Sequence, residues 1–143
     1  MLEAICFFLN GKKIEITTAG EPGLRPDMTL LNWLRLHQKL TGAKEGCAEG
    51  DCGACSVVVG RLAGDNHPVW QAVNACILFL PMLHGTVLTT IEGIAGTDGQ
   101  LHPVQQSMID NHGAQCGFCT PGFVMSLYAG WCSGLAFNTS NIE

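Results

Sequence analysis

The segment Cys47-Ala48-Glu49-Gly50-Asp51-Cys52-Gly53-Ala54-Cys55 carries three cysteines in nine residues, and Cys76 follows after twenty more. This C-x4-C-x2-C spacing with a distant fourth cysteine is typical of a plant-type [2Fe–2S] cluster, whose two irons need four thiolate ligands. Glycines at 46, 50 and 53 let the backbone approach inorganic sulfide, and backbone N–H groups of such a loop offset the cluster's negative charge. The segment therefore predicts a [2Fe–2S] site with four ligands, namely Cys47, Cys52, Cys55 and Cys76.

A structural zinc site is the main alternative for these four thiols, because four-cysteine zinc sites also use C-x2-C pairs. Such sites usually join one C-x2-C pair to another, whereas three of the cysteines here share one glycine-rich loop. The pattern therefore favours iron and sulfide over zinc.

A second cysteine pair, Cys116 and Cys119, stands directly before Thr120-Pro121. These two residues predict the cap and first position of an apolar helix over 122–131, whose positive end would favour an anionic cluster. Two thiolates serve one iron of a [2Fe–2S] unit, yet only Cys132 follows and the sequence contains no C-x-C. On spacing alone, the pair fits either half of a cluster site or a redox dithiol.

The elements around the first cysteine loop predict a β-grasp order, in which a mixed sheet grips one helix. Asn10-Gly11 between apolar runs at 4–9 and 12–17 is a two-residue hairpin signal. A helix is expected from Asp27 or Thr29 to about Leu40, with Gly42 as its stop. Further strands are expected over 56–61, 69–75 and 87–91, with a less regular apolar segment at 77–83.

The composition of the sequence changes after Glu92. Three glycines within 93–99 predict a linker, and helices are expected from Pro103 and over 122–131. We therefore expect an α+β chain with two domains. Residues 1–92 would form a β-grasp domain of the plant-type 2Fe-2S ferredoxin-like kind. Residues 93–143 would form the start of an all-α, helical-bundle domain that binds a [2Fe–2S] cluster.

The composition excludes several function classes. Hydrophobic residues make up 47% of the chain and charged residues only 13%, which suggests that part of its surface is covered by something else. A net charge of −5 without a basic run argues against nucleic acid as a partner. No segment reaches transmembrane length and no secretory signal is visible, so neither a membrane nor export is expected. Eight cysteines then point to a reducing, cytoplasmic compartment.

The remaining candidate residues carry weaker signals. Cys6 lies in an apolar strand and is expected in the core. His84, His102 and His112 are scattered, which favours ordinary hydrogen-bonding roles over metal ligation. No nucleotide-binding glycine motif and no acid–base pair is visible, so the chain shows electron-carrying chemistry without catalytic residues.

These motifs resemble the iron–sulfur part of the molybdenum hydroxylases, and most of all its xanthine dehydrogenase branch. The segment 42–55 with Asn74-Ala75-Cys76 resembles the first iron–sulfur domain of that family. Three further segments of this sequence resemble the second iron–sulfur domain of the family. They are Thr90-Ile-Glu-Gly-Ile, Leu101-His-Pro-Val-Gln-Gln and His112-Gly-Ala-Gln-Cys-Gly-Phe-Cys-Thr-Pro-Gly. The likeness covers about residues 4–129, and its motifs are specific.

The resemblance implies an oxidoreductase relay, in which electrons pass from a molybdenum–molybdopterin centre through two [2Fe–2S] clusters to FAD and NAD. Cys116 and Cys119 would bind the cluster nearer molybdenum, with Gln115 beside the pterin, and the first four cysteines the one nearer the flavin. Molybdopterin and FAD would belong to a large molybdopterin-binding subunit and to an FAD-binding subunit or domain. The substrate, in purine catabolism for the xanthine dehydrogenase branch, would be hydroxylated on another polypeptide.

The sequence departs from the family near its end. Family members continue to a Cys-Arg-Cys-Thr-Gly-Tyr segment that supplies the last two ligands, whereas this sequence stops at Glu143. We therefore expect a C-terminal truncation, one complete cluster and a second that is absent or labile. A stand-alone ferredoxin-like carrier and a non-functional gene fragment are the alternatives.

Overall fold

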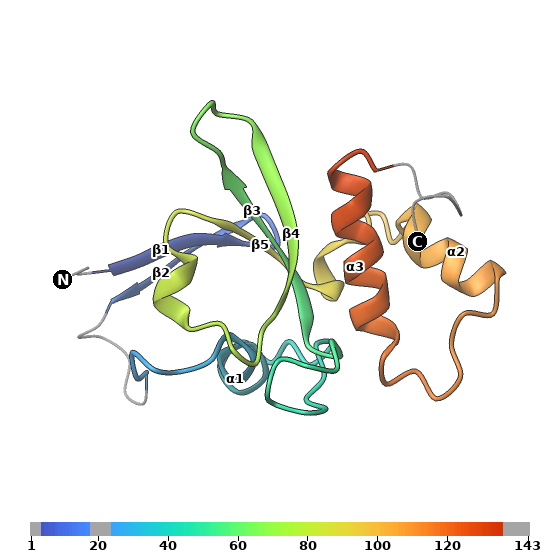
Figure 1. Ribbon diagram of the computed structural model, residues 1–143, viewed down its shortest axis with the longest axis horizontal. Coiled ribbons are helices and arrows are strands. Elements are labelled where there is room, and N and C mark those ends of the chain that lie inside the picture. The colour runs from blue at the N-terminus through green and yellow to red at the C-terminus, as the bar shows by residue number, and fades with distance from the viewer. Residues whose placement is uncertain (1–3, 18–23, 136–143) are drawn as a thin grey trace.

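The computed structural model describes residues 4–17 and 24–135, in which a five-stranded sheet is packed with helical segments (Figure 1). The strands are β1 (Ala4–Leu9), β2 (Lys12–Thr17), β3 (Ser56–Leu62), β4 (Pro68–Asn74) and β5 (Val87–Thr89). Their order in the sheet is β2-β1-β5-β3-β4, with β1 and β5 parallel and the other neighbours antiparallel. The sheet is thus two local hairpins joined by the short strand β5, and it grips a helix as a β-grasp fold does.

The hairpin predicted at Asn10-Gly11 is confirmed. Both residues have positive φ, 48° and 81°, as a two-residue turn of this kind requires. The turn sets the register of β1 against β2, in which Leu9 faces Lys12 and Ile5 faces Ile16. Ile5, Phe7 and Leu9 consequently point into the main core, while Cys6 and Phe8 lie on the other face of the sheet.

The helix that was expected to reach Leu40 is shorter than predicted. It begins as α1 (Leu30–Asn32), continues as the π-helical segment η1 (Trp33–His37), and is over by Lys39, which has a positive φ of 59°. Gly42 is therefore not its stop. Its start was predicted correctly, because the N–H of Asn32 donates to Thr29 Oγ1 at 3.3 Å.

The other predicted strands are confirmed with bounds that shift by one or two residues. β3 extends to Leu62, β4 begins at Pro68, and β5 ends at Thr89 instead of Ile91. The apolar segment 77–83 ends in the 3₁₀ helix η2 (Leu80–Leu83). A second 3₁₀ helix, η3 (Ile91–Gly93), starts the passage to the helical part.

Strand β3 is buried on both faces, which explains its unbroken run of valines. Val57 and Val59 lie in the main core with Leu30, Leu34 and Trp33, which packs edge-on against Phe7 at 5.6 Å between ring centroids. Val58 points to the opposite face and joins a second core. The remaining buried members of that second core are Ile94, Val104, Val124, Met125 and Ala129.

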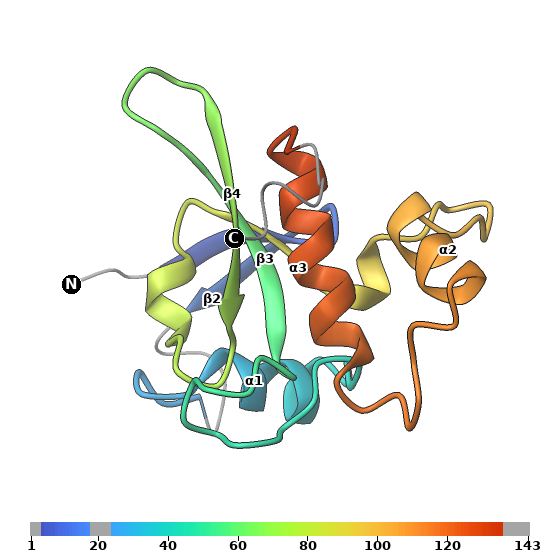
Figure 2. The same cartoon turned by 45° about the vertical axis from the view of Figure 1, so that its right-hand side comes forward.

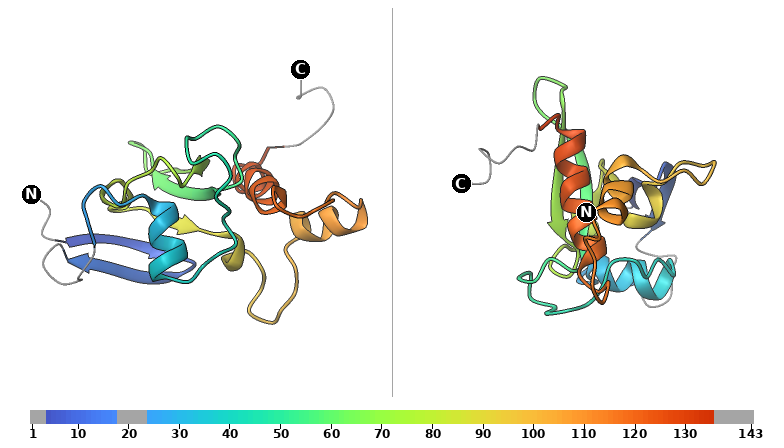
Figure 3. Two further views of the ribbon diagram at one scale, coloured as in Figure 1. Left: turned by 90° about the horizontal axis from the view of Figure 1, so that it is seen from below. Right: turned by 90° about the vertical axis from the view of Figure 1, so that its right-hand side faces the viewer.

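Two helices supply the other half of this second core, α2 (Pro103–Asp110) and α3 (Thr120–Cys132). Figures 1 and 2 show α3 standing between the sheet and α2, and Figure 3 shows the same arrangement from two further sides. In the described ranges the longest helix is α3, with 13 residues, and none has the length and apolarity needed to cross a membrane.

The passage from the sheet to α2 is tied to the β-grasp part at two points. The N–H of Thr90 donates to Asn10 Oδ1 at 2.9 Å, and Asn10 Nδ2 donates to Thr90 Oγ1 at 2.9 Å. Further along, Glu92 Oε1 accepts a bond from the N–H of Gly42 at 2.6 Å. The start of the expected linker over 93–99 is thus fastened to the hairpin turn and to the segment that leads into the cysteine loop.

Candidate metal centre

The cysteine loop, residues 41–55, follows η1 after the short segment 38–40 and is held in place by Arg35, which lies in η1. The guanidinium of Arg35 donates from Nη1 to the carbonyl oxygens of Thr41 at 3.0 Å and Ala43 at 2.8 Å. The two ends of the loop are closed by a bond from the N–H of Lys44 to the carbonyl of Ala54 at 3.0 Å. The loop is therefore anchored at its entry and closed at its base.

Asn74 fastens the loop to the segment that carries the fourth cysteine. Its Nδ2 donates to the carbonyl of Gly50 at 2.6 Å, and its Oδ1 accepts a 3.4 Å bond from Ser56 Oγ. Asn74 ends β4 two residues before Cys76, so these bonds fix Cys76 opposite the loop. Gly50 has a φ of 83°, a backbone shape that favours glycine and turns its carbonyl toward Asn74.

The four predicted ligands of the first site are brought together as two pairs. The thiol of Cys52 lies near enough to that of Cys47, and the thiol of Cys55 near enough to that of Cys76, to influence its pKa. Cys55 and Cys76 are buried, with 3% and 8% of their surface exposed, whereas Cys47 is half-buried and Cys52 exposed. One pair thus lies toward the core and the other toward solvent.

Backbone amides stabilise the thiolate form of Cys47. The N–H groups of Cys52 at 3.3 Å, Glu49 at 3.5 Å and Asp51 at 3.3 Å all donate to its Sγ. They lower the pKa of Cys47 to about 6, with the Cys52 amide the largest cause. The sequence predicted that backbone N–H groups of the loop offset negative charge, and at Cys47 those N–H groups belong to non-glycine residues.

Cys76 has the opposite electrostatic environment. Burial, reinforced by the neighbouring Cys55 thiol, raises the pKa of Cys76 to about 11. A buried thiolate at this position needs a cation beside it. The thiol pairs therefore suit a metal group that contributes positive charge between them.

The donor set fits a two-iron cluster. Each iron of a [2Fe–2S] unit takes two thiolates, and the pairs Cys47–Cys52 and Cys55–Cys76 provide two donors on either side. Among residues 4–17 and 24–135, no group of three or more His, Cys, Asp or Glu residues is arranged to hold one metal ion. What the structure offers is the paired arrangement.

The second cysteine pair lies at the start of α3. Cys119 is the N-cap residue, with Thr120 as the first helical residue and Pro121 as the second, so the helix begins one residue earlier than predicted. Thr120 is consequently not the cap. Cys116 and Cys119 are both exposed, and Cys119 sits at the positive end of the helix dipole, which favours an anionic group.

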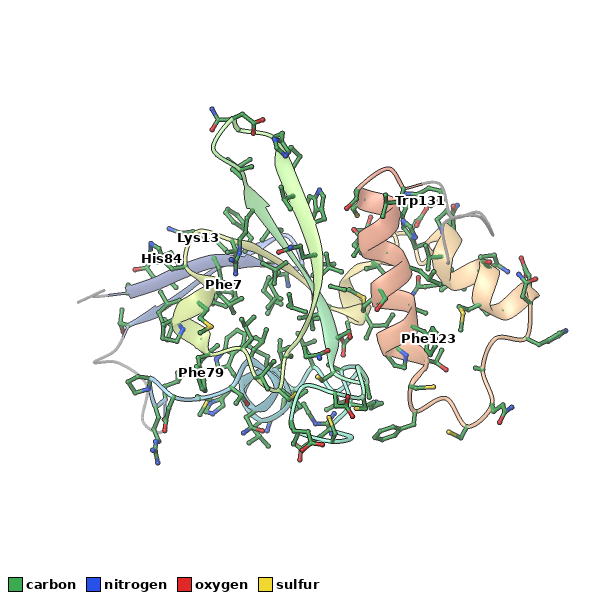
Figure 4. The ribbon with its side chains drawn as sticks, viewed as in Figure 1. Phe7, Lys13, Phe79, His84, Phe123 and Trp131 are labelled. Carbon is green, nitrogen blue, oxygen red and sulfur yellow. The ribbon has the colours of Figure 1, made fainter. Side chains whose placement is uncertain are left out.

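Cys132 is far from this second pair. It ends α3, whereas Cys119 precedes the helix, and 13 helical residues span about 20 Å. Figure 4 shows the same separation through Phe123 and Trp131, which lie at opposite ends of α3. Cys132 instead lies one helical turn from Tyr128; burial, reinforced by the neighbouring Cys132 thiol, raises the pKa of Tyr128 to about 12. Cys132 thus does not complete the second site.

The two cysteine sites meet across one hollow. The loop 41–55 and the start of α3 come to the same end of the molecule (Figures 1 and 2). Between them lies an open cavity of about 220 Å³, here named the inter-site hollow. Its lining consists of Cys52, Gly53, Ser56, Cys119, Gly122, Phe123 and Ser126.

Two of the three histidines have hydrogen-bonding roles, as expected. His84 Nδ1 accepts a bond from the N–H of Cys6 at 3.2 Å. His102 caps α2, because its Nδ1 accepts from the N–H of Val104 at 3.3 Å while Gln105 bonds back to the N–H of His102. The expectation that Cys6 lies in the core is wrong: it is half-buried on the opposite face of the sheet.

Sequence reasoning missed the residues that hold the site together, Arg35, Asn74, Glu92 and Asn10. Arg35 bonds to carbonyls 6 and 8 residues further along the chain, whereas the partners of Asn74, Glu92 and Asn10 lie 24, 50 and 80 residues away. The hairpin motif identified Asn10 as a turn residue but gave no indication of its partner Thr90. The sequence carried one signal for Asn74: Asn74-Ala75-Cys76 resembles a segment of the first iron–sulfur domain of the molybdenum hydroxylases.

Two families of iron–sulfur domains match the chain. The family described as 2Fe-2S iron-sulfur cluster binding domain matches residues 7–80. The family described as [2Fe-2S] binding domain matches residues 90–139. The two matches contain the first and the second cysteine site respectively.

Curated relatives match over most of this chain. Xanthine dehydrogenase of Drosophila pseudoobscura pseudoobscura is 50% identical over 126 residues, which is 87% of the chain. Aldehyde oxidase 2 of Cavia porcellus is 44% identical over 128 residues, or 89% of the chain. The chain spans only 9% of the length of either relative.

Solved structures share the fold. An aldehyde oxidoreductase from Desulfovibrio desulfuricans superposes with a TM-score of 0.75 and 33% identity, over 96% of this chain and 14% of its own. Quinoline 2-oxidoreductase from Pseudomonas putida 86 gives a TM-score of 0.69 and 26% identity, over 98% of this chain and 85% of the matched chain.

Proposed function

Because this chain belongs to the family of 2Fe-2S iron–sulfur cluster binding domains, we propose that it is the electron-transfer part of a molybdenum hydroxylase of the xanthine dehydrogenase type. In that role it carries electrons from a molybdopterin centre toward FAD and NAD. The relatives at 44–50% identity are oxidoreductases, and the chain matches their iron–sulfur part.

The observation that carries the proposal is the pairing of the first four thiols. Cys47 and Cys52 are neighbours on the solvent side, and Cys55 and Cys76 are neighbours on the core side. A [2Fe–2S] cluster bound there supplies one-electron redox chemistry. We assign these four cysteines as its ligands.

The residues around the first site tune and shield such a group. Three amides aimed at Cys47 offset negative charge on the solvent side. Asn74 and Arg35 hold the loop closed, so the four sulfurs keep their positions when the charge of the site changes. A rigid ligand shell of this kind favours fast electron exchange, because little structure has to rearrange.

We propose that Cys116 and Cys119 supply two of the four thiolates of a second [2Fe–2S] cluster, with Gln115 exposed beside them toward the pterin. The stretch 1–143 then completes one cluster by itself and contributes to another. We place the boundary between the two domains near residue 92, where η3 leaves the sheet.

A partner surface is supported by exposed apolar side chains next to both sites. Ile77 follows Cys76 and has 55% of its surface exposed, while Phe118 and Phe123, beside the second pair, have 47% and 62% exposed. Burial of such exposed apolar side chains against another protein surface is favourable. We propose that the molybdopterin-binding and FAD-binding parts of the enzyme cover them, which distinguishes this chain from a stand-alone carrier.

We further propose that the protein works in a reducing compartment, the cytoplasm. All eight cysteines are free thiols in the structure, and six of them are assigned here to clusters. A reducing compartment keeps such thiols available for iron.

Iron and acid-labile sulfide analysis of the chain purified without oxygen tests the proposed function. Two irons and two sulfides per chain are expected, with the visible absorption of a [2Fe–2S] cluster. Zinc in place of iron would overturn the assignment. Four irons per chain would overturn the statement that residues 1–143 complete only one site.

A further inference from the structure

Helix α3 approaches the cysteine loop at Gly122, which is buried. A Cβ atom at Gly122 would overlap the carbonyl oxygen of Gly53, and would lie 3.1 Å from the carbonyl carbon of Gly53 and 3.3 Å from Cα of Ala54. All three are backbone atoms, so they cannot rotate away as a flexible side chain would. Any side chain at position 122 therefore has to separate the helix from the loop.

This contact lies between the two cysteine sites. Gly53 follows Cys52 directly, and Gly122 lies in the first turn of α3 after Cys119. Cys52, from the loop, and Cys119, from the start of α3, both line the inter-site hollow, together with both glycines. The distance between the two thiol sites is consequently set by how closely Gly122 approaches Gly53.

Local helix formation does not explain the glycine. Gly122 is not among the glycines with positive φ, and a glycine inside a helix costs about 1 kcal/mol relative to alanine. The close approach of the helix to the backbone of Gly53 explains why position 122 carries glycine.

Other contacts of α3 fix the rest of the helix, so the distance between its first turn and the cysteine loop depends on the contact of Gly122 with Gly53. Val124 and Met125 pack into the second core against Val58. At the far end of the helix, Ser133 Oγ donates to the carbonyl of Trp70 at 3.4 Å. A side chain at position 122 would therefore tilt α3 about its anchored far end and open the end that carries Cys119.

We propose that Gly122 is a positioning residue: it sets the spacing between the first and second cluster sites, and so the step that electrons take between them. This inference rests on the proposed function. A residue with a merely structural role would change stability, whereas this one changes a distance.

The test measures that distance in the full chain. Cys6, Cys119 and Cys132 are replaced by serine, the first cluster is assembled with iron and sulfide, and a nitroxide is attached to Cys116. Pulsed electron paramagnetic resonance then gives the separation between the reduced cluster and the nitroxide. Gly122→Ala and Gly122→Val are compared with Gly64→Ala, which adds the same methyl group in open space.

The separation is expected to lengthen from Gly122 to Ala to Val while iron and sulfide content stays constant, and to stay unchanged in Gly64→Ala. An unchanged separation in Gly122→Ala or Gly122→Val, with the cluster and helix content intact, would overturn the inference. Should Gly122→Val not fold, Gly122→Ala and Gly122→Ser decide by the same criterion. Absence of iron and sulfide from the unsubstituted chain is a different result, since it removes the proposed function itself.

Discussion

Asn10 and Thr90 exchange two hydrogen bonds across 80 residues of sequence, each 2.9 Å long. Asn10 forms the hairpin turn between β1 and β2, and Thr90, which is fully buried, follows the last residue of β5 and starts the passage to the helices. The turn that closes the first hairpin thus also fixes the point at which the helical part leaves the sheet.

Replacing Asn10 by glycine should lower the free energy of unfolding by about 1–3 kcal/mol, because the buried N–H of Thr90 loses its acceptor. Glycine tolerates the φ of 48° at this position, so the loss of stability measures the missing side-chain hydrogen bonds and not a strained turn. Asn10→Asp keeps an acceptor for Thr90 and should lose less. Urea unfolding of the three chains measures the difference, and equal midpoints would contradict the role of the bonds.

Replacing any one of the four first-site cysteines by serine should abolish or strongly reduce the [2Fe–2S] absorption. Cys76→Ser is the sharpest case, because it removes a buried sulfur from the core-side pair. Cys6→Ser and Cys132→Ser are matched controls, since these cysteines lie outside both sites, and both should retain two irons per chain. A Cys132→Ser chain that loses its iron would show that our ligand set is wrong.

Gly46→Ala should make the first cluster labile without straining the backbone. The added Cβ would lie 2.8 Å from Cys52 Sγ, well inside contact distance, so the sulfur has to move. Faster loss of visible absorption in the presence of an iron chelator is the expected result. Gly64→Ala, where the same atom meets open space, should lose absorption at the rate of the unsubstituted chain.

Acidification should loosen α2 through its cap, His102. Burial lowers the pKa of His102 below its usual 6.5, and its neutral Nδ1 accepts the bond from Val104. The stabilisation is therefore complete above pH 6.5 and is lost as pH falls toward the lower pKa of the folded state, because the unfolded chain binds the proton first.

Hydrogen exchange of the α2 amides between pH 7 and 5, corrected for intrinsic rates, measures this effect. Protection should fall with pH in the unsubstituted chain and stay level in His102→Asn, since asparagine caps a helix without titrating. An equal fall in protection in both chains would show that a group other than His102 causes the effect.

The cysteine loop and the hairpin could be read from the sequence because their signals are local. Asn10-Gly11 contains the whole turn, and Cys47–Cys55 contains three of the four ligand candidates. The pairing of the thiols could not be read, because it depends on Asn74 holding Gly50 against the end of β4. A side chain bonded to a distant backbone atom leaves no periodic pattern.

The helix after Thr29 shows how packing overrides a local expectation. Its first amides, which have no partner inside a helix, donate to another part of the chain, Leu30 to the carbonyl of Leu78 and Leu31 to that of Ala75. Leu30, Leu31, Trp33 and Leu34 are all buried, so four nearly consecutive residues face the core, and the segment continues from Trp33 as a π-helix instead of presenting one α-helical apolar stripe. Cys6 was misplaced for a related reason: an apolar strand does not reveal which face is the core.

The placement of β5 dictates an order of assembly during synthesis. The hairpins β1–β2 and β3–β4 form from neighbouring sequence, but among residues 4–17 and 24–135 only Val87–Thr89 join them into one sheet. All four first-site cysteines leave the ribosome before this strand does. We expect iron loading to wait for it, so that a chain ended at residue 80 stays colourless while one ended at residue 100 binds two irons.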